Sequence, residues 1–281
     1  MFKTIRPLVT FALLASCAAL QAGCGARQIR AAQDAFNQGA QAENAERAAT
    51  FSGGQPPLDA ASAAASYHTA LTLLDTELRE HETDLQQENL LGTALMIKAM
   101  SLWRLADLES GGPLAPSRAA LAEALNDAKS KAGAQLGTRD RVMAAALPGL
   151  YDHDLGLQAT TLGEASERFS SAYRLLSEAL QSETPPPNHP VRIYVWLAQL
   201  STLRAYQSAI YRFGDPINPL NPPAELKDIH TCAKLVVLQM KPVLHDDPEL
   251  QRFVEFVNTA IGIPSVASVT VPEGTQCRFD S

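Results

Sequence analysis

The chain has 281 residues and a net charge of −7 at neutral pH, from 23 lysine and arginine residues against 30 aspartate and glutamate residues. This acidic balance argues against a nucleic-acid partner, because phosphate binding requires a basic surface. Hydrophobic residues make up 46% of the chain but aromatic residues only 6%, with alanine filling much of the difference. Such a composition is typical of helices that pack closely on other helices.

The first 24 residues have the pattern of a secretory signal. Lys3 and Arg6 precede an apolar stretch from Pro7 to Leu20, which is shorter than the roughly 20 residues that a helix needs to cross a bilayer. Removal of this segment leaves 21 basic and 30 acidic residues, a net charge of −9. We therefore expect an exported body that does not dock on anionic lipid by itself.

A cysteine near the end of this segment marks an expected lipid anchor. The sequence Leu14-Ala15-Ser16-Cys17 resembles the lipobox of bacterial lipoproteins, whose cysteine is lipidated and becomes the new N-terminus. Gln21-Ala22-Gly23-Cys24 is the second candidate, but it lacks an aliphatic residue three positions before the cysteine. Cleavage at Cys17 leaves an odd number of cysteines, whereas cleavage at Cys24 leaves a pair. We expect attachment at Cys17, with Cys24 as the alternative. Neither is followed by aspartate, so the resemblance implies the outer membrane, facing the periplasm.

After the signal, helical spacing of apolar residues predicts an all-α fold of stacked antiparallel helix pairs. Proline and glycine clusters separate the predicted helices, which cover 26–49, a segment from 59, 85–108, a segment from 117, 139–147, 149–157, 162–182, 190–213, 224–244 and 247–261. Pro148 is expected to kink or break the helical stretch that contains it. Asp246 or Asp247 is expected to cap the last helix, with Pro248 at its first position.

The proline run Pro185-Pro186-Pro187 is the clearest candidate for a hinge. The expected organisation is a signal and anchor region over 1–24, an N-terminal helical array over 25–184, a C-terminal helical segment over 185–263 and a tail over 264–281. This short, irregular tail is expected to add at most one short strand, at 266–271.

One side-chain spacing occurs twice. A small residue, an aromatic residue four positions later and a second small residue three positions after that fall on one helix face: Ala63, Tyr67 and Ala70 in the first copy, and Ala165, Phe169 and Ala172 in the second. This spacing resembles the second helix of the tetratricopeptide repeat, and the copies lie 102 residues apart (165 minus 63), three times the repeat's period of about 34. The first-helix signature of that family, Trp-x2-Leu-Gly-x2-Tyr, is missing. The resemblance implies a tetratricopeptide-like α-solenoid.

Two cysteines, Cys232 and Cys277, remain in the body, and an exported compartment permits disulfides. We expect a disulfide that fixes the tail to a helix, with two buried free thiols as the alternative.

Enzyme motifs and cofactor loops are missing from the sequence, which favours a protein without catalytic activity or cofactor. The triplets Asp152-His153-Asp154 and His245-Asp246-Asp247 are poor metal sites because adjacent helical residues point in different directions. The first triplet is expected to be a solvated helix face.

These features predict a membrane-tethered scaffold or adapter in the periplasm that binds protein or peptide partners of the cell envelope. The alternative is a small-molecule-binding accessory lipoprotein of a transporter, similar to the T components of TRAP-type systems. In that alternative, aromatic residues of the helix over 190–213, such as Trp196 and Tyr206, line a ligand cavity rather than a core.

Overall fold

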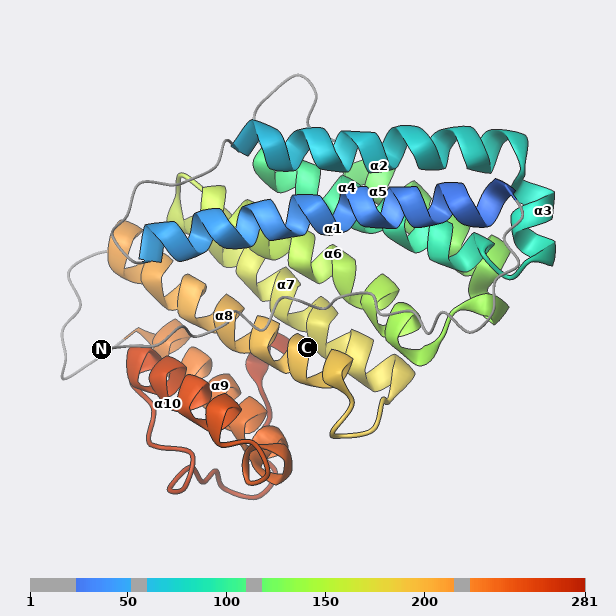
Figure 1. Cartoon of the computed structure of the whole chain (residues 1–281). Helices are drawn as coiled ribbons and strands as arrows, with labels where there is room; N and C mark the ends of the chain where they lie inside the picture. The colour runs from blue at the N-terminus through green and yellow to red at the C-terminus, as the bar shows by residue number, and fades with distance from the viewer. Residues whose placement is uncertain (1–23, 52–59, 110–117, 215–222, 281) are drawn as a thin grey trace. The chain divides into compact units, whose positions relative to one another are not determined.

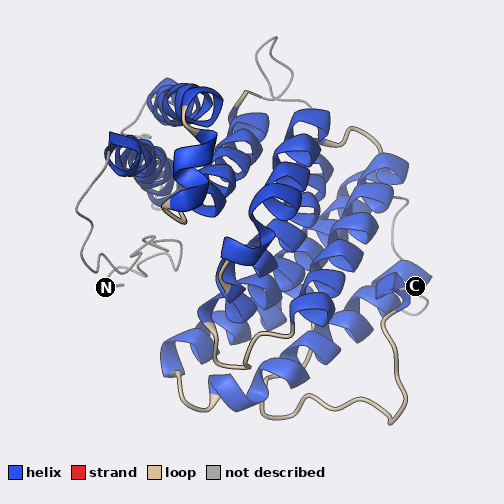
Figure 2. Ribbon diagram, turned by 90° about the vertical axis from the view of Figure 1, so that its right-hand side faces the viewer, coloured by secondary structure: helices blue, strands red, loops and turns tan. Residues whose placement is uncertain are grey.

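The computed structural model describes residues 24–51, 60–109, 118–214 and 223–280. These residues form ten α-helices and two short 3-10 helices, with no strand among them (Figure 2). The predicted all-helical class is confirmed. The chain divides into two compact units, Met1–Leu136 and Gly137–Ser281. None of the described helices combines the length and apolar character needed to cross a membrane.

The first unit contains five helices, namely α1 (Cys24–Phe51), α2 (Ala60–Glu80), α3 (Glu82–Gln87), α4 (Leu91–Leu108) and α5 (Arg118–Ala132), followed by η1 (Gly133–Gln135). Helix α1 packs along α2, α2 packs on α4, and α4 packs on α5, while α1 also contacts α4 (Figure 1). The sequence predicted one helix over 85–108, but the chain breaks between α3 and α4. Asn89 has a φ of 59° there, a left-handed conformation that asparagine adopts more readily than most residues.

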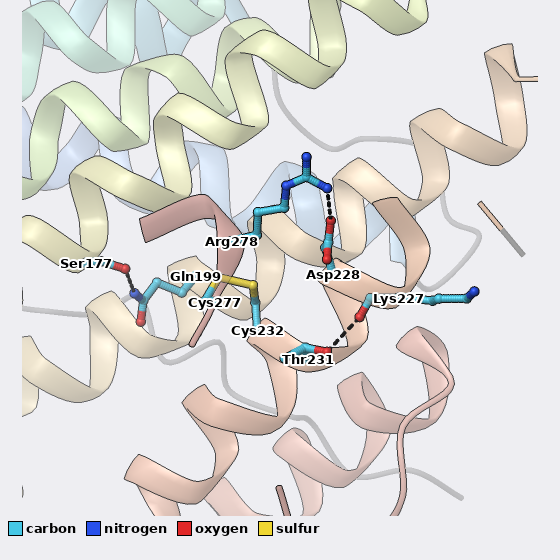
Figure 3. The surroundings of a disulfide bond; sticks show 8 residues. All are labelled: Ser177, Gln199, Lys227, Asp228, Thr231, Cys232, Cys277 and Arg278. Atoms are coloured by element: carbon cyan, nitrogen blue, oxygen red, sulfur yellow. Dashed lines mark hydrogen bonds and ion pairs between the residues drawn. A yellow bond between two sulfur atoms is a disulfide. The ribbon is translucent and has the colours of Figure 1, made fainter. Parts of the chain in front are cut away.

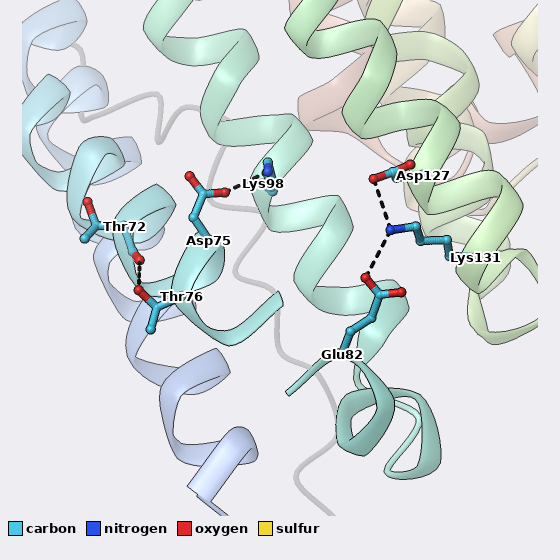
Figure 4. A network of polar contacts seen from close by, with 7 residues as sticks. All are labelled: Thr72, Asp75, Thr76, Glu82, Lys98, Asp127 and Lys131. Carbon is cyan, nitrogen blue, oxygen red and sulfur yellow. Dashed lines mark hydrogen bonds and ion pairs between the residues drawn. The ribbon is translucent and has the colours of Figure 1, made fainter. Parts of the chain in front are cut away.

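Polar contacts join the helices of the first unit both in its interior and at its surface. Within the fold, Arg104 of α4 donates from Nε and Nη2 to the carboxylate of Glu43 on α1, at 3.0–3.2 Å, and both residues are buried. Near the surface, Lys98 bonds Asp75 at 2.7 Å and Lys131 bonds Glu82 at 3.0 Å (Figure 4). The exposed pairs contribute little to stability, whereas the buried pair depends on both partners being present.

The second unit contains five helices, namely α6 (Thr138–Gln158), α7 (Leu162–Glu183), α8 (Pro190–Phe213), α9 (Ala224–Leu244) and α10 (Pro248–Ile261), and ends in η2 (Arg278–Asp280). Each of α6 to α9 packs on the helix that follows it, and in addition α6 contacts α8 and α8 contacts α10. The helices can be grouped in pairs, α1 with α2, α4 with α5, α6 with α7 and α8 with α9. In the first unit α1 then contacts its partner α2 and α4, the first helix of the next pair. In the second unit α6 contacts α7 and α8 in the same way. Short connections between such neighbours are typical of antiparallel packing.

Helix α6 continues through Pro148, so the predicted interruption there is wrong. Proline removes one backbone donor and crowds the preceding turn. This cost is offset here by packing, because α6 lies against α7 along its length and Gly149 sits directly against that helix. Tertiary contacts commonly outweigh local propensity in this way.

The proline run lies inside the second unit, between α7 and α8, whereas the unit boundary lies at Leu136 and Gly137. Thr184 ends α7 in a left-handed conformation, and Pro185 is buried. Arg192 of α8 donates from Nη1 to the Pro185 carbonyl at 2.6 Å. Because α7 and α8 also pack on each other, this connection is held against the helix that follows it.

The last helix begins as its sequence predicts. Asp247 accepts hydrogen bonds from the backbone amides of Glu249 and Leu250, at 3.1 and 2.9 Å, and Pro248 occupies the first turn. The tail beyond Gly262 forms turns instead of the short strand expected at 266–271. The amides of Ser268 and Val269 both donate to the Ser265 carbonyl there, which closes a turn.

Candidate functional site

The two predicted triplets occupy equivalent places in the two units. The first triplet lies on α2 and the second on α7, each the second helix of its pair. All six side chains are at most 1% exposed: Ala63, Tyr67, Ala70, Ala165, Phe169 and Ala172. The small residues therefore flank a buried ring in each unit, as the spacing predicts.

Each of these rings packs against a glycine of the preceding helix. A Cβ atom added at Gly39 of α1 would lie 2.9 Å from the Tyr67 ring, and one added at Gly156 of α6 would lie 2.6 Å from the Phe169 ring. Three residues before each glycine is a second ring that contacts the first. The ring centroids of Phe36 and Tyr67 are 5.3 Å apart, and those of His153 and Phe169 are 5.9 Å apart. We call this arrangement the glycine–ring lock.

The lock extends to α4 in the first unit and to α8 in the second. Tyr67 forms a buried cluster with Leu105 of α4. Phe169 stacks on Tyr206 of α8, with ring centroids 6.0 Å apart. The same helical-pair packing, with a contact to the next pair, is thus built twice in one chain.

A groove of about 310 Å³ lies in the second unit, next to its glycine–ring lock. The C-terminal part of α6 contributes His153, Gly156 and Leu157, α7 contributes Phe169, and α8 contributes the remaining lining residues. The exposed fraction of Leu157 is 55%, so the groove presents apolar surface to solvent. Its size is at the lower end of the range for ligand-binding clefts.

The groove is basic although the chain is acidic. Arg204 and Arg212 line it together with Ser201 and Ser208, and no aspartate or glutamate is among its described lining residues. Arg204 lies over the ring of Phe256 on α10, at 5.6 Å from its centroid, and Arg212 lies over Phe213, at 4.7 Å. Stacking on a ring leaves the guanidinium N–H groups free to donate to an anion.

Cys232 of α9 and Cys277 of the tail form a disulfide, the pair predicted from the cysteine count (Figure 3). Their Cα atoms are 4.8 Å apart and both side chains are buried. Beyond the bridge, Phe279 packs against Tyr173 of α7 and Tyr206 of α8, with ring centroids 6.0 and 5.7 Å apart. The bridge therefore holds the tail against the same helices that carry the lock.

Asp152 is buried, so the expectation of a solvated face is wrong for this residue. Its carboxylate accepts a hydrogen bond from Ser171 at 2.7 Å and faces Arg168 at 3.5 Å. The neighbouring His153 bonds Thr202 through Nδ1 at 3.1 Å. Both residues thus tie α6 to its neighbours. Within the described residues, no group of three or more histidine, cysteine or acidic side chains is placed to hold a metal ion.

The aromatic residues of α8 are divided between core and surface. Trp196 is 1% exposed and Tyr206 is 2% exposed, whereas Tyr211 is 60% exposed. The Trp196 indole donates to Gln239 of α9 at 3.0 Å. Trp196 and Tyr206 therefore fill the core between helices, and a cavity along this helix would have to use other side chains.

Both lipid-attachment candidates fall at the edge of what the structure describes. Cys17 lies outside the described residues, and Cys24 is the first residue of α1, with no description of its side chain.

Comparison of the chain with known protein families, with curated proteins and with solved structures finds no match in any of the three.

The sequence predicted the triplet rings Tyr67 and Phe169 but not the second rings, the glycines or the groove. A ring lies three residues before a glycine in both Phe36-x2-Gly39 and His153-x2-Gly156. This shared spacing could have shown that α1 and α6 correspond, just as the triplets show that α2 and α7 correspond. Arg204 and Arg212 carry no local signal, because the absence of carboxylates around them results from packing of separate helices.

Proposed function

We propose that the protein is a lipid-anchored scaffold or adapter of the bacterial cell envelope, built from tetratricopeptide-like helix pairs and binding protein partners in the periplasm. The observation that carries the proposal is the glycine–ring lock, which occurs once in each unit on equivalent helices. Repeated helix pairs of this kind expose a row of first helices, a surface that repeat proteins use for binding without catalytic groups.

The contacts between the first and second helices of each pair support the tetratricopeptide-like part of the proposal. In each unit the glycine belongs to the first helix and the small–aromatic–small triplet to the second, as in that family. The remaining first-helix residues of the family signature are missing, so the likeness rests on the lock itself. The anchor is proposed on Cys17, or on Cys24, and the location on the outer membrane, from the signal sequence alone.

A bead-binding experiment tests this function. The mature body, fixed to beads through an N-terminal tag in place of the lipid, is incubated with detergent extract of envelopes from the producing bacterium. We expect a small, reproducible set of proteins that a Gly39→Ala/Gly156→Ala variant, with both locks disrupted, fails to retain. Retention of no protein by the folded wild-type body contradicts the scaffold function, whereas the same set on both proteins would show that binding does not depend on the locks.

A further inference from the structure

We propose that the groove on α8 binds an extended acidic peptide segment of the form acidic-x-apolar-x-acidic. The inference rests on the proposed function and specifies the chemistry of its partner. Two guanidiniums and two serine hydroxyls line the groove without a carboxylate among the described lining residues, in a body whose net charge is −9 once the signal is removed. Because the rest of the body repels acidic segments, a groove of opposite charge selects where such a segment binds.

The spacing of the arginines sets the length of the ligand. Arg204 and Arg212 are eight residues apart on one helix, which corresponds to about 12 Å along its axis. They are held apart because Arg204 stacks on Phe256 of α10 and Arg212 stacks on Phe213. An extended chain rises about 3.3 Å per residue, so two carboxylates four residues apart reach both arginines.

The apolar lining of the groove determines which residue suits the centre of the peptide. Ala205 and Ala209 leave room along α8, while Leu157 and Phe213 supply apolar contact. In an extended peptide, residues one, three and five lie on the same side. A central apolar residue therefore faces the groove together with the two acidic residues.

The hydroxyls supply acceptors for the backbone of the peptide. Ser208 already donates its hydroxyl hydrogen to the Arg204 carbonyl at 3.0 Å, so its oxygen is available to accept from a peptide N–H. The guanidiniums donate to the two carboxylates, and charge-assisted hydrogen bonds of this kind are the strong ones.

Fluorescent peptides measured by anisotropy against the intact mature body test the proposal. The probe has the core Glu-Ser-Leu-Ser-Glu between Gly-Ser flanks. Its controls replace both glutamates with glutamine, place the glutamates next to each other, or replace leucine with serine. We expect each control to bind more weakly, the glutamine peptide by about tenfold or more, and binding of the probe to weaken as salt is raised.

Protein variants locate the binding site. We expect Arg204→Glu/Arg212→Glu to lose at least about tenfold in affinity for the probe. The matched variant Lys227→Glu/Arg252→Glu changes the charge of the same unit equally at exposed positions outside the groove, and we expect it to keep the wild-type affinity. Circular dichroism melts establish that both variants fold.

Three outcomes overturn the inference: equal loss in both variants, equal binding of the glutamine peptide, or binding of phosphatidylglycerol vesicles through these arginines with no binding of the peptide. The bead experiment separates this failure from failure of the scaffold function. If Arg204→Glu/Arg212→Glu retains the same envelope proteins as the wild type, the groove is not the binding site but the scaffold function stands. If the wild type retains none, the scaffold function itself fails.

Discussion

Two glycines determine how closely the first two helices of each unit approach. Gly39 and Gly156 each face an aromatic ring at a distance that leaves no room for a methyl group. Glycine within a helix costs about 0.5–1 kcal/mol relative to alanine. The structure accepts this cost twice at the same place in the packing, which indicates that close approach of the helices is worth more than local helix propensity.

Substitution of Gly156 by alanine tests the lock. The new methyl group would overlap the buried Phe169 ring, so we expect the second unit to lose about 1–3 kcal/mol in its free energy of unfolding. Chemical denaturation monitored by circular dichroism measures this loss. Gly163→Ala is the matched control, because Gly163 lies near the start of α7 with open space around it, and we expect this variant to be neutral or slightly more stable. Equal stability of the two variants contradicts the lock.

His230 gives the second unit a dependence on pH. Burial lowers the pKa of this histidine below its ordinary value near 6.5, with a smaller contribution from Lys234 in the same direction, partly offset by the Ile261 carbonyl. The unfolded chain then binds more protons than the folded one as pH falls below 6.5. Stability from this residue is therefore present above pH 6.5 and is lost as pH falls from there toward the lowered pKa.

We expect the free energy of unfolding of the wild type to fall more between pH 7.5 and pH 5 than that of His230→Gln, which removes the titrating group. Urea unfolding of both proteins at the two pH values measures the difference. Parallel pH dependence in the two proteins would show that another group is responsible.

At the scale of helices, the sequence predicted most elements and failed where tertiary contacts outweigh local signals. The starts of α8 and α9 and the cap of α10 follow directly from Pro190, Pro223 and Asp247. Pro148 predicted a break in α6 that does not occur. The contacts with α7 that offset the cost of this proline cannot be read from the local sequence. The turn at Asn89 was missed for the opposite reason, since apolar residues on both sides kept helical spacing while one residue changed conformation.

The tail of the second unit depends on its disulfide. The bridge closes a separation of 45 residues, and cross-links of that length typically stabilise a protein by about 2–4 kcal/mol. We expect Cys232→Ala/Cys277→Ala to lose about this much free energy of unfolding and therefore to unfold at a lower denaturant concentration, with loss of amide-exchange protection at the Val269 amide. Reduction of the wild type should produce the same loss. A variant as stable as the oxidised wild type would show that packing of Phe279 and Val269 alone holds the tail.

At the scale of the whole molecule, the sequence supports an expectation about the class of function but carries no signal for the groove. Charge, signal sequence and the repeated triplets together favour an exported binder. The groove was not predictable, because Leu157, Arg204 and Phe256 are brought together from three helices that are far apart in sequence. A single sequence shows which residues share a helix face but not which faces meet.

The anchor is tested by changing each candidate cysteine in the full-length chain. We expect Cys17→Ala to release the protein from the membrane fraction because the lipidated residue is lost, whereas Cys24→Ala should remain bound. Mass spectrometry of the N-terminal peptide identifies the modified residue. The reverse pattern assigns the lipid to Cys24, and release by neither change contradicts lipid anchoring.

Cross-linking in living cells tests the central claim most directly. A photoreactive amino acid is placed at Ser208, an exposed residue of the groove, or at Gly163, an exposed residue outside it. If the protein is a scaffold that binds partners along α8, illumination should give discrete adducts with envelope proteins from position 208 and none from position 163. Absence of adducts from position 208, or the same adducts from both positions, would contradict the account.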